Sequence, residues 1–168
     1  MKNIIFMWMF CLPMMVNAQN YELNLEARNE VEKLEFLLGE WSGSGWMLNQ
    51  SREKMTFEQK ETVQMKINGT GLLIEGVGTS GGEIIHNALA IITKADGEGK
   101  YKFDSFLQSN QHGTFKAELK GDVLYWYPTE NVRYVIRINE KGQWFEIGEA
   151  NVGGNWYQFF EMTLDKSN

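Results

Sequence analysis

TFEQKETVQMKI, residues 56–67, alternates between two kinds of side chain along its whole length. One face holds the apolar residues Phe57, Val63, Met65 and Ile67 together with Gln59 and Glu61, and the intervening positions are all polar. Because successive side chains of a β-strand point to opposite faces, this pattern predicts a half-buried strand. The dipeptide Asn-Gly at 68–69 follows, which is typical of the turn in a β-hairpin.

Similar runs recur along the chain, each bounded by turn residues such as glycine, asparagine or aspartate. The predicted strands are 41–48, 56–67, 72–78, 83–93, 101–107, 113–119, 123–127, 131–139, 144–150 and 156–164. About ten strands joined by tight turns are best buried as a closed up-and-down antiparallel β-barrel, because closure leaves no exposed strand edge. A β-sandwich is the alternative fold, although its crossovers normally need longer loops.

One segment has the period of a helix. Between Glu26 and Leu38 the apolar residues recur every three or four positions, which places them in one stripe. Asn24 is suited to cap the start of this helix, and Gly39 is suited to end it. We expect the short N-terminal helix to plug the barrel or to pack against one of its ends.

Residues 1–18 are typical of a secretory signal peptide. Lys2 precedes an apolar stretch that is shorter than a membrane span of roughly 20 residues, and small residues end it at Ala18. Cleavage there would leave residues 19–168 as a single barrel domain, exported to the periplasm or secreted, with no membrane insertion. An uncleaved membrane anchor is the alternative. Cys11, the one cysteine, would leave with the signal peptide, so no disulfide would hold the barrel.

Charge and metal-binding residue types narrow the partners. The formal net charge is −6, and an acidic surface repels nucleic-acid phosphates and anionic lipids. We therefore expect neither as a partner, and the oligomeric state cannot be read from the sequence. The only histidines are His86 and His112, which are few ligands for a transition metal. We expect no metal and no other cofactor.

The glycine-rich segment GVGTSGG, residues 76–82, matches two functional motifs. One is the dinucleotide-binding pattern G-x-G-x-x-G, and the other is the nucleophile elbow G-x-S-x-G. Both need a helix directly after the glycine-rich turn, whereas an alternating strand follows here. The segment is therefore interpreted as a strand end and a hairpin loop.

Polar and aromatic residues on otherwise apolar strand faces are the candidate ligand-binding residues. If these faces point inward, the polar groups need hydrogen-bond partners inside the lumen. The candidates are Gln59, Glu61, His86, Tyr134, Trp144, Glu146, Trp156 and Gln158. In one interpretation the polar groups form a closed network, in which Arg133 or His86 pairs with a glutamate. In the other they are polar anchors for a ligand in an aromatic cavity. The two interpretations are compatible.

Three functions follow from this arrangement. An aromatic, incompletely filled barrel favours binding of a small apolar or amphipathic molecule, since eight strands already enclose about one small ligand. No catalytic spacing is recognisable, but Glu61, Glu146 and His86 would be the groups of an acid–base enzyme. A ligand-free structural protein of the cell envelope would instead expose an apolar patch. The residues to inspect for such a patch are Phe106, Phe145 and Phe159.

Several stretches resemble a family of exported bacterial proteins of unknown function. The stretches are FLLGEW (36–41), GLLIEG (71–76), ALAII (88–92), WFEIGE (144–149) and WYQFFEMTL (156–164). The resemblance implies a lipocalin-like barrel that is distantly similar to the haem-binding nitrobindins, and it implies no activity. Nitrobindins bind haem through a histidine near the C-terminal end of the chain. This sequence has no histidine after His112, so haem binding by that route is not expected.

Overall fold

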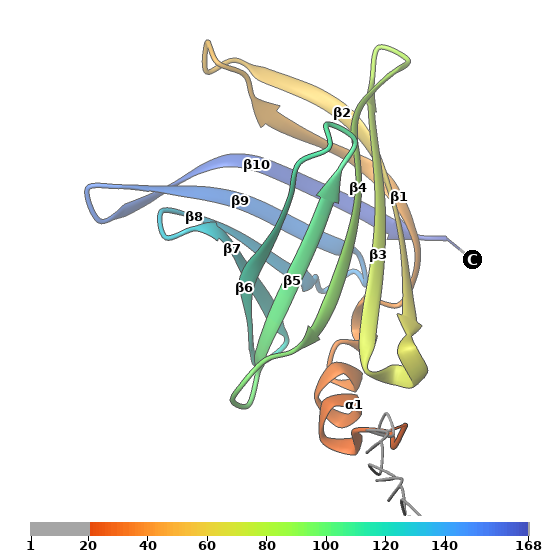
Figure 1. Cartoon of the computed structure of the whole chain (residues 1–168). Coiled ribbons are helices and arrows are strands. Elements are labelled where there is room, and N and C mark those ends of the chain that lie inside the picture. The colour runs from red at the N-terminus through yellow and green to blue at the C-terminus, as the bar shows by residue number, and fades with distance from the viewer. Residues whose placement is uncertain (1–20, 168) are drawn as a thin grey trace, which may run out of the picture.

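The computed structural model describes residues 21–167, and the proposed signal peptide lies outside the described residues. The elements are α1 (Leu25–Glu32), η1 (Glu35–Leu37), β1 (Gly39–Leu48), β2 (Lys54–Lys66), η2 (Ile67–Gly69), β3 (Gly71–Ser80), β4 (Glu83–Lys94), β5 (Lys100–Leu107), β6 (His112–Lys120), β7 (Val123–Thr129), β8 (Val132–Ile138), β9 (Trp144–Val152) and β10 (Asn155–Lys166). Every strand pairs with its neighbours in sequence, and β1 also pairs with β10. The predicted closed antiparallel barrel is confirmed, and the sandwich alternative is wrong (Figure 1).

The predicted strands are all present, with ends that differ by a few residues. The strand predicted over 56–67 is β2, which ends at Lys66. Ile67 and Asn68 have φ angles of 53° and 54°, which are in the left-handed region and end the extended backbone. Ile67 is therefore exposed in the η2 turn instead of lying on the apolar face of the strand.

The predicted N-terminal helix is two shorter helices, α1 and η1, which lie at one end of the barrel (Figure 1). The side chain of Asn24 caps α1 by accepting a hydrogen bond of 2.9 Å from the Ala27 backbone N–H. Gly39, with φ of 124°, begins β1 directly after η1. The chain thus turns from the helices into the barrel wall without a linker.

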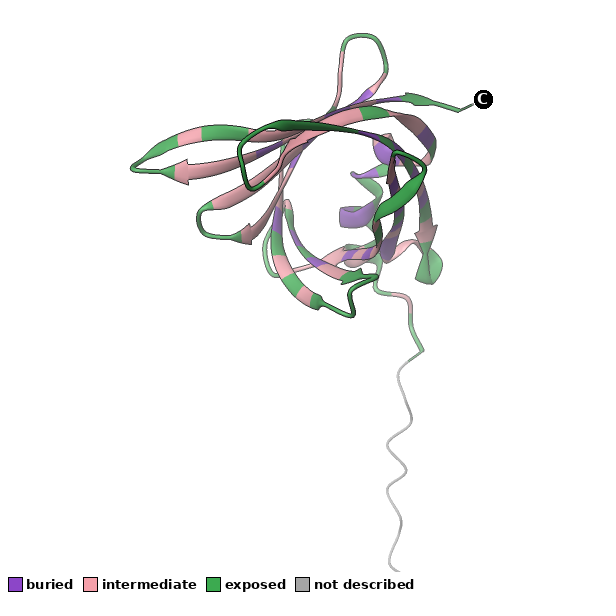
Figure 2. Ribbon diagram, turned by 90° about the horizontal axis from the view of Figure 1, so that it is seen from above, coloured by how far each residue is buried: buried purple, intermediate pink, exposed green. Residues whose placement is uncertain are grey.

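The hydrophobic core fills the end of the barrel that the helices cover. Val31, Leu34 and Leu37 from the helical segment are fully buried. The large strand residues in the same cluster include Trp41, Leu72, Ile92, Tyr101, Leu124, Trp144 and Leu164. These strand residues lie near the ends of their strands that face the helices. Figure 2 looks into the barrel from the opposite end, with the buried helical residues visible through the ring.

Glu30 and Tyr101 fasten α1 to the barrel. The Glu30 carboxylate accepts hydrogen bonds from the Gly99 backbone N–H (2.7 Å) and from Lys33 Nζ (3.1 Å). The Tyr101 hydroxyl donates to the Glu30 carbonyl oxygen at 2.9 Å. These contacts join the helix to β5 and to the loop that precedes it, so the helices close this end of the barrel.

The substitution Tyr101→Phe should lower the free energy of unfolding by about 0.5–1.5 kcal/mol, because it removes the shorter of the two hydrogen bonds that the buried Glu30 carbonyl oxygen accepts. The matched control is Tyr125→Phe, since the Tyr125 side chain lies on the outer face of β7 and its hydroxyl has no hydrogen-bond partner among residues 21–167. Urea unfolding of the two variants measures the difference. Equal loss in both variants would contradict the fastening role of Tyr101.

Candidate ligand-binding site

The barrel encloses a cavity of about 470 Å³ on the side of the core away from the helices. This volume lies within the roughly 300–1,000 Å³ of small-molecule sites. Each of the ten strands contributes at least one lining side chain, and most of these side chains are apolar or aromatic. None of the lining residues is lysine or arginine. The cavity is therefore a largely apolar chamber without a lysine or arginine side chain.

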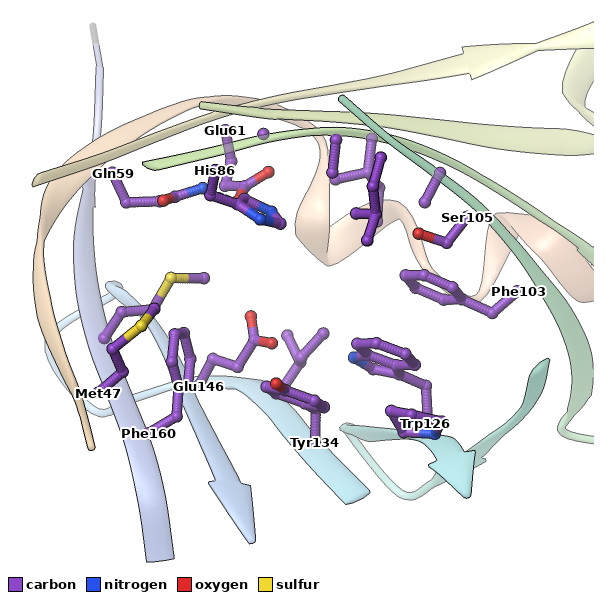
Figure 3. A pocket seen from close by; sticks show the side chains of 18 of the residues that line it. Met47, Gln59, Glu61, His86, Phe103, Ser105, Trp126, Tyr134, Glu146 and Phe160 are labelled. Carbon is purple, nitrogen blue, oxygen red and sulfur yellow. The ribbon is translucent and has the colours of Figure 1, made fainter. Parts of the chain in front are cut away.

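Six of the eight candidate residues lie in this cavity. They are Gln59, Glu61, His86, Tyr134, Trp144 and Glu146. Figure 3 shows Gln59, Glu61 and His86 on one side of the space, and Tyr134 and Glu146 on the other. Trp144 is fully buried at the boundary between the cavity and the packed core.

Trp156 and Gln158 lie outside the lumen, so their predicted inward orientation is wrong. The pairing of β9 with β10 shifts register between Gln158 and Phe160, which adds one residue to β10 as a β-bulge. The bulge exchanges the two faces of the strand, so Phe160 lines the cavity whereas Gln158 is exposed. On the exterior, Gln158 Nε2 donates to Glu161 Oε2 at 2.7 Å, and the Arg133 guanidinium lies 4.1 Å from the ring centroid of Trp156.

Glu61 and Glu146 are both buried, with less than a tenth of each residue exposed. Gln59 Nε2 donates to Glu61 Oε1 at 2.7 Å, and Trp144 Nε1 donates to Glu146 Oε2 at 3.1 Å. Burial and the nearby charge of Glu146 raise the pKa of Glu61 to about 8, although the hydrogen bond from Gln59 lowers it. Burial also raises the pKa of Glu146 to about 7, against hydrogen bonds from the Trp144 and Trp126 side chains. Burial thus favours the protonated form of both carboxyls.

The closed network with Arg133 does not form. Arg133 Nε lies 2.7 Å from Glu149 Oε2, and this ion pair is on the barrel exterior. His86 lines the cavity, and burial lowers the pKa of its imidazole, so His86 is neutral at neutral pH. The two buried carboxyls therefore have no cationic side chain among residues 21–167 to balance their charge.

Two glycines of the GVGTSGG segment make room for these polar side chains. A Cβ atom on Gly76 would lie 2.7 Å from Glu61 Oε1, and one on Gly78 would lie 2.5 Å from Gln59 Oε1. The segment is the end of β3 and a hairpin loop, as the sequence predicts, and β4 follows it. Because Gly76 and Gly78 have no side chain, the Glu61 carboxylate and the Gln59 amide can lie flat against β3.

The substitution Gly76→Ala should lower the free energy of unfolding by about 1–3 kcal/mol, because the new methyl group collides with the Glu61 carboxylate. A double-mutant cycle supplies the control. With Glu61→Ala already present, the methyl group has room, and Gly76→Ala should cost little. Denaturant unfolding of the four proteins measures the coupling. Independent effects of the two substitutions would show that the glycine has another role.

Aromatic rings form one wall of the cavity. Phe103 stacks on Trp126 with ring centroids 4.5 Å apart, and Trp126 stacks on Tyr134 at 4.6 Å. Phe160 meets Tyr134 edge-on at 5.5 Å and stacks on Phe57. These rings hold one another in place, so the wall presents preformed aromatic surface to the lumen. Figure 3 shows Phe103, Trp126 and Tyr134 along one side of the space.

Sequence reasoning missed part of this wall. Phe103, Ser105, Phe115 and Trp126 were not among the candidates, although all four line the cavity. The period of two could have found Trp126, which shares the inner face of β7 with the fully buried Leu124. Aromatic rings on an apolar strand face look like ordinary core residues, so the alternation alone does not separate the wall of a cavity from packed core.

The three residues proposed for an exterior apolar patch are dispersed, and the ring of Phe159 packs against Tyr134, which lines the cavity. Phe106 is exposed on β5 and stacks on His112, whereas Phe145 and Phe159 lie on β9 and β10 and are half-buried. The Arg137 guanidinium lies 5.0 Å from the Phe145 ring centroid, and Phe159 meets Tyr134 edge-on. The three rings therefore do not form one patch.

Comparison with solved structures supports the fold. The protein Rv2717c from M. tuberculosis matches with a TM-score of 0.61 at 14% sequence identity, over 83% of this chain and 98% of that one. This chain has the same barrel fold. The S-type phycobiliprotein lyase CPES from Guillardia theta matches at a TM-score of 0.44 and 12% identity, over 86% of this chain and 96% of that one. No protein-family model and no curated protein matches the sequence.

The described part of the chain offers neither a cluster of metal ligands nor a membrane-spanning helix. No cluster of three or more histidine, cysteine, aspartate or glutamate side chains is placed to hold a metal ion in residues 21–167. In the same range no helix has the length and apolar character needed to cross a membrane.

Proposed function

We propose that this protein is an exported binding protein that holds a small, partly apolar molecule inside its barrel. The observation that carries the proposal is the cavity itself: about 470 Å³, lined by aromatic and aliphatic side chains, with a few polar groups directed into it. Apolar walls with a small number of convergent polar groups are the usual composition of a ligand site. The core beneath the cavity is packed, so a ligand would enter from the end away from the helices.

A neutral fluorescent dye such as Nile red tests whether the lumen binds apolar molecules. The substitution Ala88→Trp places an indole inside the cavity, because Ala88 lines it. The matched control is Asn87→Trp, which places the same ring on the exposed outer face of β4. We expect wild type and Asn87→Trp to bind the dye alike, and Ala88→Trp to bind it at least about tenfold more weakly, since 1.4 kcal/mol of lost contact suffices for that.

Native mass spectrometry of protein purified from its source gives an independent readout, namely a co-purified small molecule that Ala88→Trp loses. Absence of both a co-purified molecule and dye binding in the wild type would sink the proposal. Equal dye binding in wild type and Ala88→Trp would place the dye elsewhere and would also contradict it.

Export is the part of the proposal that rests on the sequence alone. Cleavage after Ala18 would give a mature chain that begins at Gln19. Cell fractionation followed by intact-mass measurement tests this. A protein found inside the cell with its first 18 residues retained would contradict export and would leave the binding proposal standing.

An acid–base enzyme that uses the same lumen is the second candidate. It is favoured by one observation: Glu61, Glu146 and His86 face a common space, and both carboxyls have a pKa raised toward neutrality. Such groups serve as general acids and bases when a substrate lies within hydrogen-bond reach. Turnover of a co-purified molecule, abolished by Glu61→Gln, would establish this function over simple binding.

A further inference from the structure

The two buried carboxyls narrow the class of molecule that the lumen accepts. Glu61 lies on β2 and Glu146 on β9, on opposite sides of the cavity, and their side chains extend into the same space (Figure 3). Burial leaves Glu61 with one hydrogen-bond partner, Gln59, which donates to Oε1. Glu61 Oε2 accepts no hydrogen bond from any residue in the described range. This oxygen has no donor among residues 21–167, and the Glu61 carboxyl lines the cavity.

Among residues 21–167, no side chain that lines the cavity supplies a positive charge to this pair of carboxyls. The titratable side chains that line the cavity are Glu61 on β2, His86 on β4, Tyr134 on β8 and Glu146 on β9. Burial disfavours the charged imidazolium of His86, and burial with the nearby Glu146 raises the pKa of Tyr134, which therefore stays a neutral phenol. An anionic ligand would lie beside two acidic groups in a site of low dielectric, where it repels either carboxyl in its ionised form.

The aromatic wall supplies the apolar surface against which the body of a ligand packs. Phe103, Trp126 and Tyr134 form the stacked wall, and Glu146 lines the cavity beside it. The net charge of −6 attracts cations toward the barrel.

We propose that the ligand of the lumen is a small organic cation, an ammonium group on an aromatic or alkyl body, whose nitrogen lies between Glu61 and Glu146. This inference rests on the proposed binding function and specifies its ligand class. The ammonium N–H groups donate to Glu61 Oε2 and to Glu146, and the apolar body lies against the aromatic wall. Both carboxylates are then ionised, because an adjacent positive charge favours their charged form.

Three probes of similar shape and different charge test the ligand class by isothermal titration calorimetry at pH 8. They are tryptamine, a cation, tryptophol, its neutral alcohol, and indole-3-propionate, an anion. We expect tryptamine to bind at least about tenfold more tightly than tryptophol, and indole-3-propionate to bind most weakly. In the double variant Glu61→Gln with Glu146→Gln, tryptamine should fall to the affinity of tryptophol, while tryptophol changes little.

The matched control is Glu149→Gln, which removes a carboxylate from the exterior ion pair with Arg133. It should leave the preference for tryptamine intact. A second readout is proton release: tryptamine binding between about pH 5 and pH 8 should expel protons from the two carboxyls, and tryptophol should not. Titration in two buffers of different ionisation enthalpy measures the number released.

The outcomes separate this inference from the proposed function. Equal or tighter binding of tryptophol or indole-3-propionate would overturn the cationic class and leave a working binding site. A preference for tryptamine that survives in the double variant would also overturn it. Nile red binding in the lumen without binding of any indole probe would do the same. Failure of Nile red and all three indole probes would overturn both proposals.

Discussion

The barrel should become less stable as the pH rises from about 5 to about 8. Glu61 and Glu146 have pKa values raised to about 8 and about 7 in the folded protein, against about 4.5 in the unfolded chain. Between these limits the folded state binds more protons than the unfolded state, so the free energy of unfolding falls with pH. At about 1.4 kcal/mol for each unit by which a pKa differs between the folded and unfolded states, we expect the two carboxyls together to cost at most about 6 kcal/mol of stability over this range.

Isosteric variants test whether the two lumen carboxyls cause this loss of stability. Glu61→Gln and Glu146→Gln each remove one titrating carboxyl and keep its shape, so each should match the wild type near pH 5 and exceed its stability at pH 8. The control is Glu75→Gln, since Glu75 is exposed on the outer face of β3. Urea unfolding across the pH range measures these effects. A wild-type stability that stays flat or rises between pH 5 and pH 8 would contradict the two raised pKa values.

Removal of the Trp144 side chain should cause the largest loss of stability in the core. Its ring is fully buried and meets Trp41 edge-on at a centroid distance of 5.9 Å. Trp144 Nε1 also donates to Glu146 Oε2. Trp144→Ala should lower the free energy of unfolding by about 3–5 kcal/mol, because it leaves a large cavity at the boundary between the core and the lumen.

Two further substitutions separate packing from hydrogen bonding. Trp144→Phe keeps most of the ring but removes the donor to Glu146, so its cost should be smaller and should grow with pH as Glu146 ionises. Trp46→Ala is the matched control, because Trp46 lies half-buried on the outer face of β1 with Lys54 Nζ 3.6 Å from its ring centroid. Its cost should be no more than about 1 kcal/mol. A loss for Trp144→Ala as small as this would show that the ring does not support the barrel.

The closed barrel could be predicted because every level of the sequence agrees with it. The alternation in residues 56–67, the turn dipeptides and the absence of long linkers each favour hairpins between neighbouring strands. Closure then follows from the need to pair the first and last strands. The pattern of Gln59 and Glu61 beside Val63 also predicted which face of β2 points inward. Gln59 and Glu61 line the cavity, and Val63 is buried in the core.

The error at Trp156 and Gln158 arose where a strand changes face. A β-bulge between Gln158 and Phe160 reverses the alternation within β10, and one inserted residue exchanges inside for outside along the rest of the strand. A similar shift in the pairing of β3 with β4 leaves Ile84 exposed although His86 lines the cavity. No local residue pattern marked either bulge, since both depend on how neighbouring strands are staggered.

The cavity itself could not be derived from the sequence. Its presence depends on how far the N-terminal helices extend into the barrel, and they stop after filling one end. The absence of a positive counterion depends on Arg133 facing the exterior, where it pairs with Glu149. Both facts concern three-dimensional placement, which the alternation of residue types in a strand leaves open.

Methyl NMR with a bound probe tests most directly whether the lumen is a binding site. Methyl groups of Ala88, Ala90 and Met162 line the cavity, whereas those of Val135 and Ile147 lie on outward positions of β8 and β9. On titration with tryptamine, we expect saturable shifts of the lumen methyl resonances and little change in the outer methyl resonances. Shifts confined to outer methyl groups, or unshifted lumen methyl groups in the presence of a bound probe, would contradict binding in the lumen.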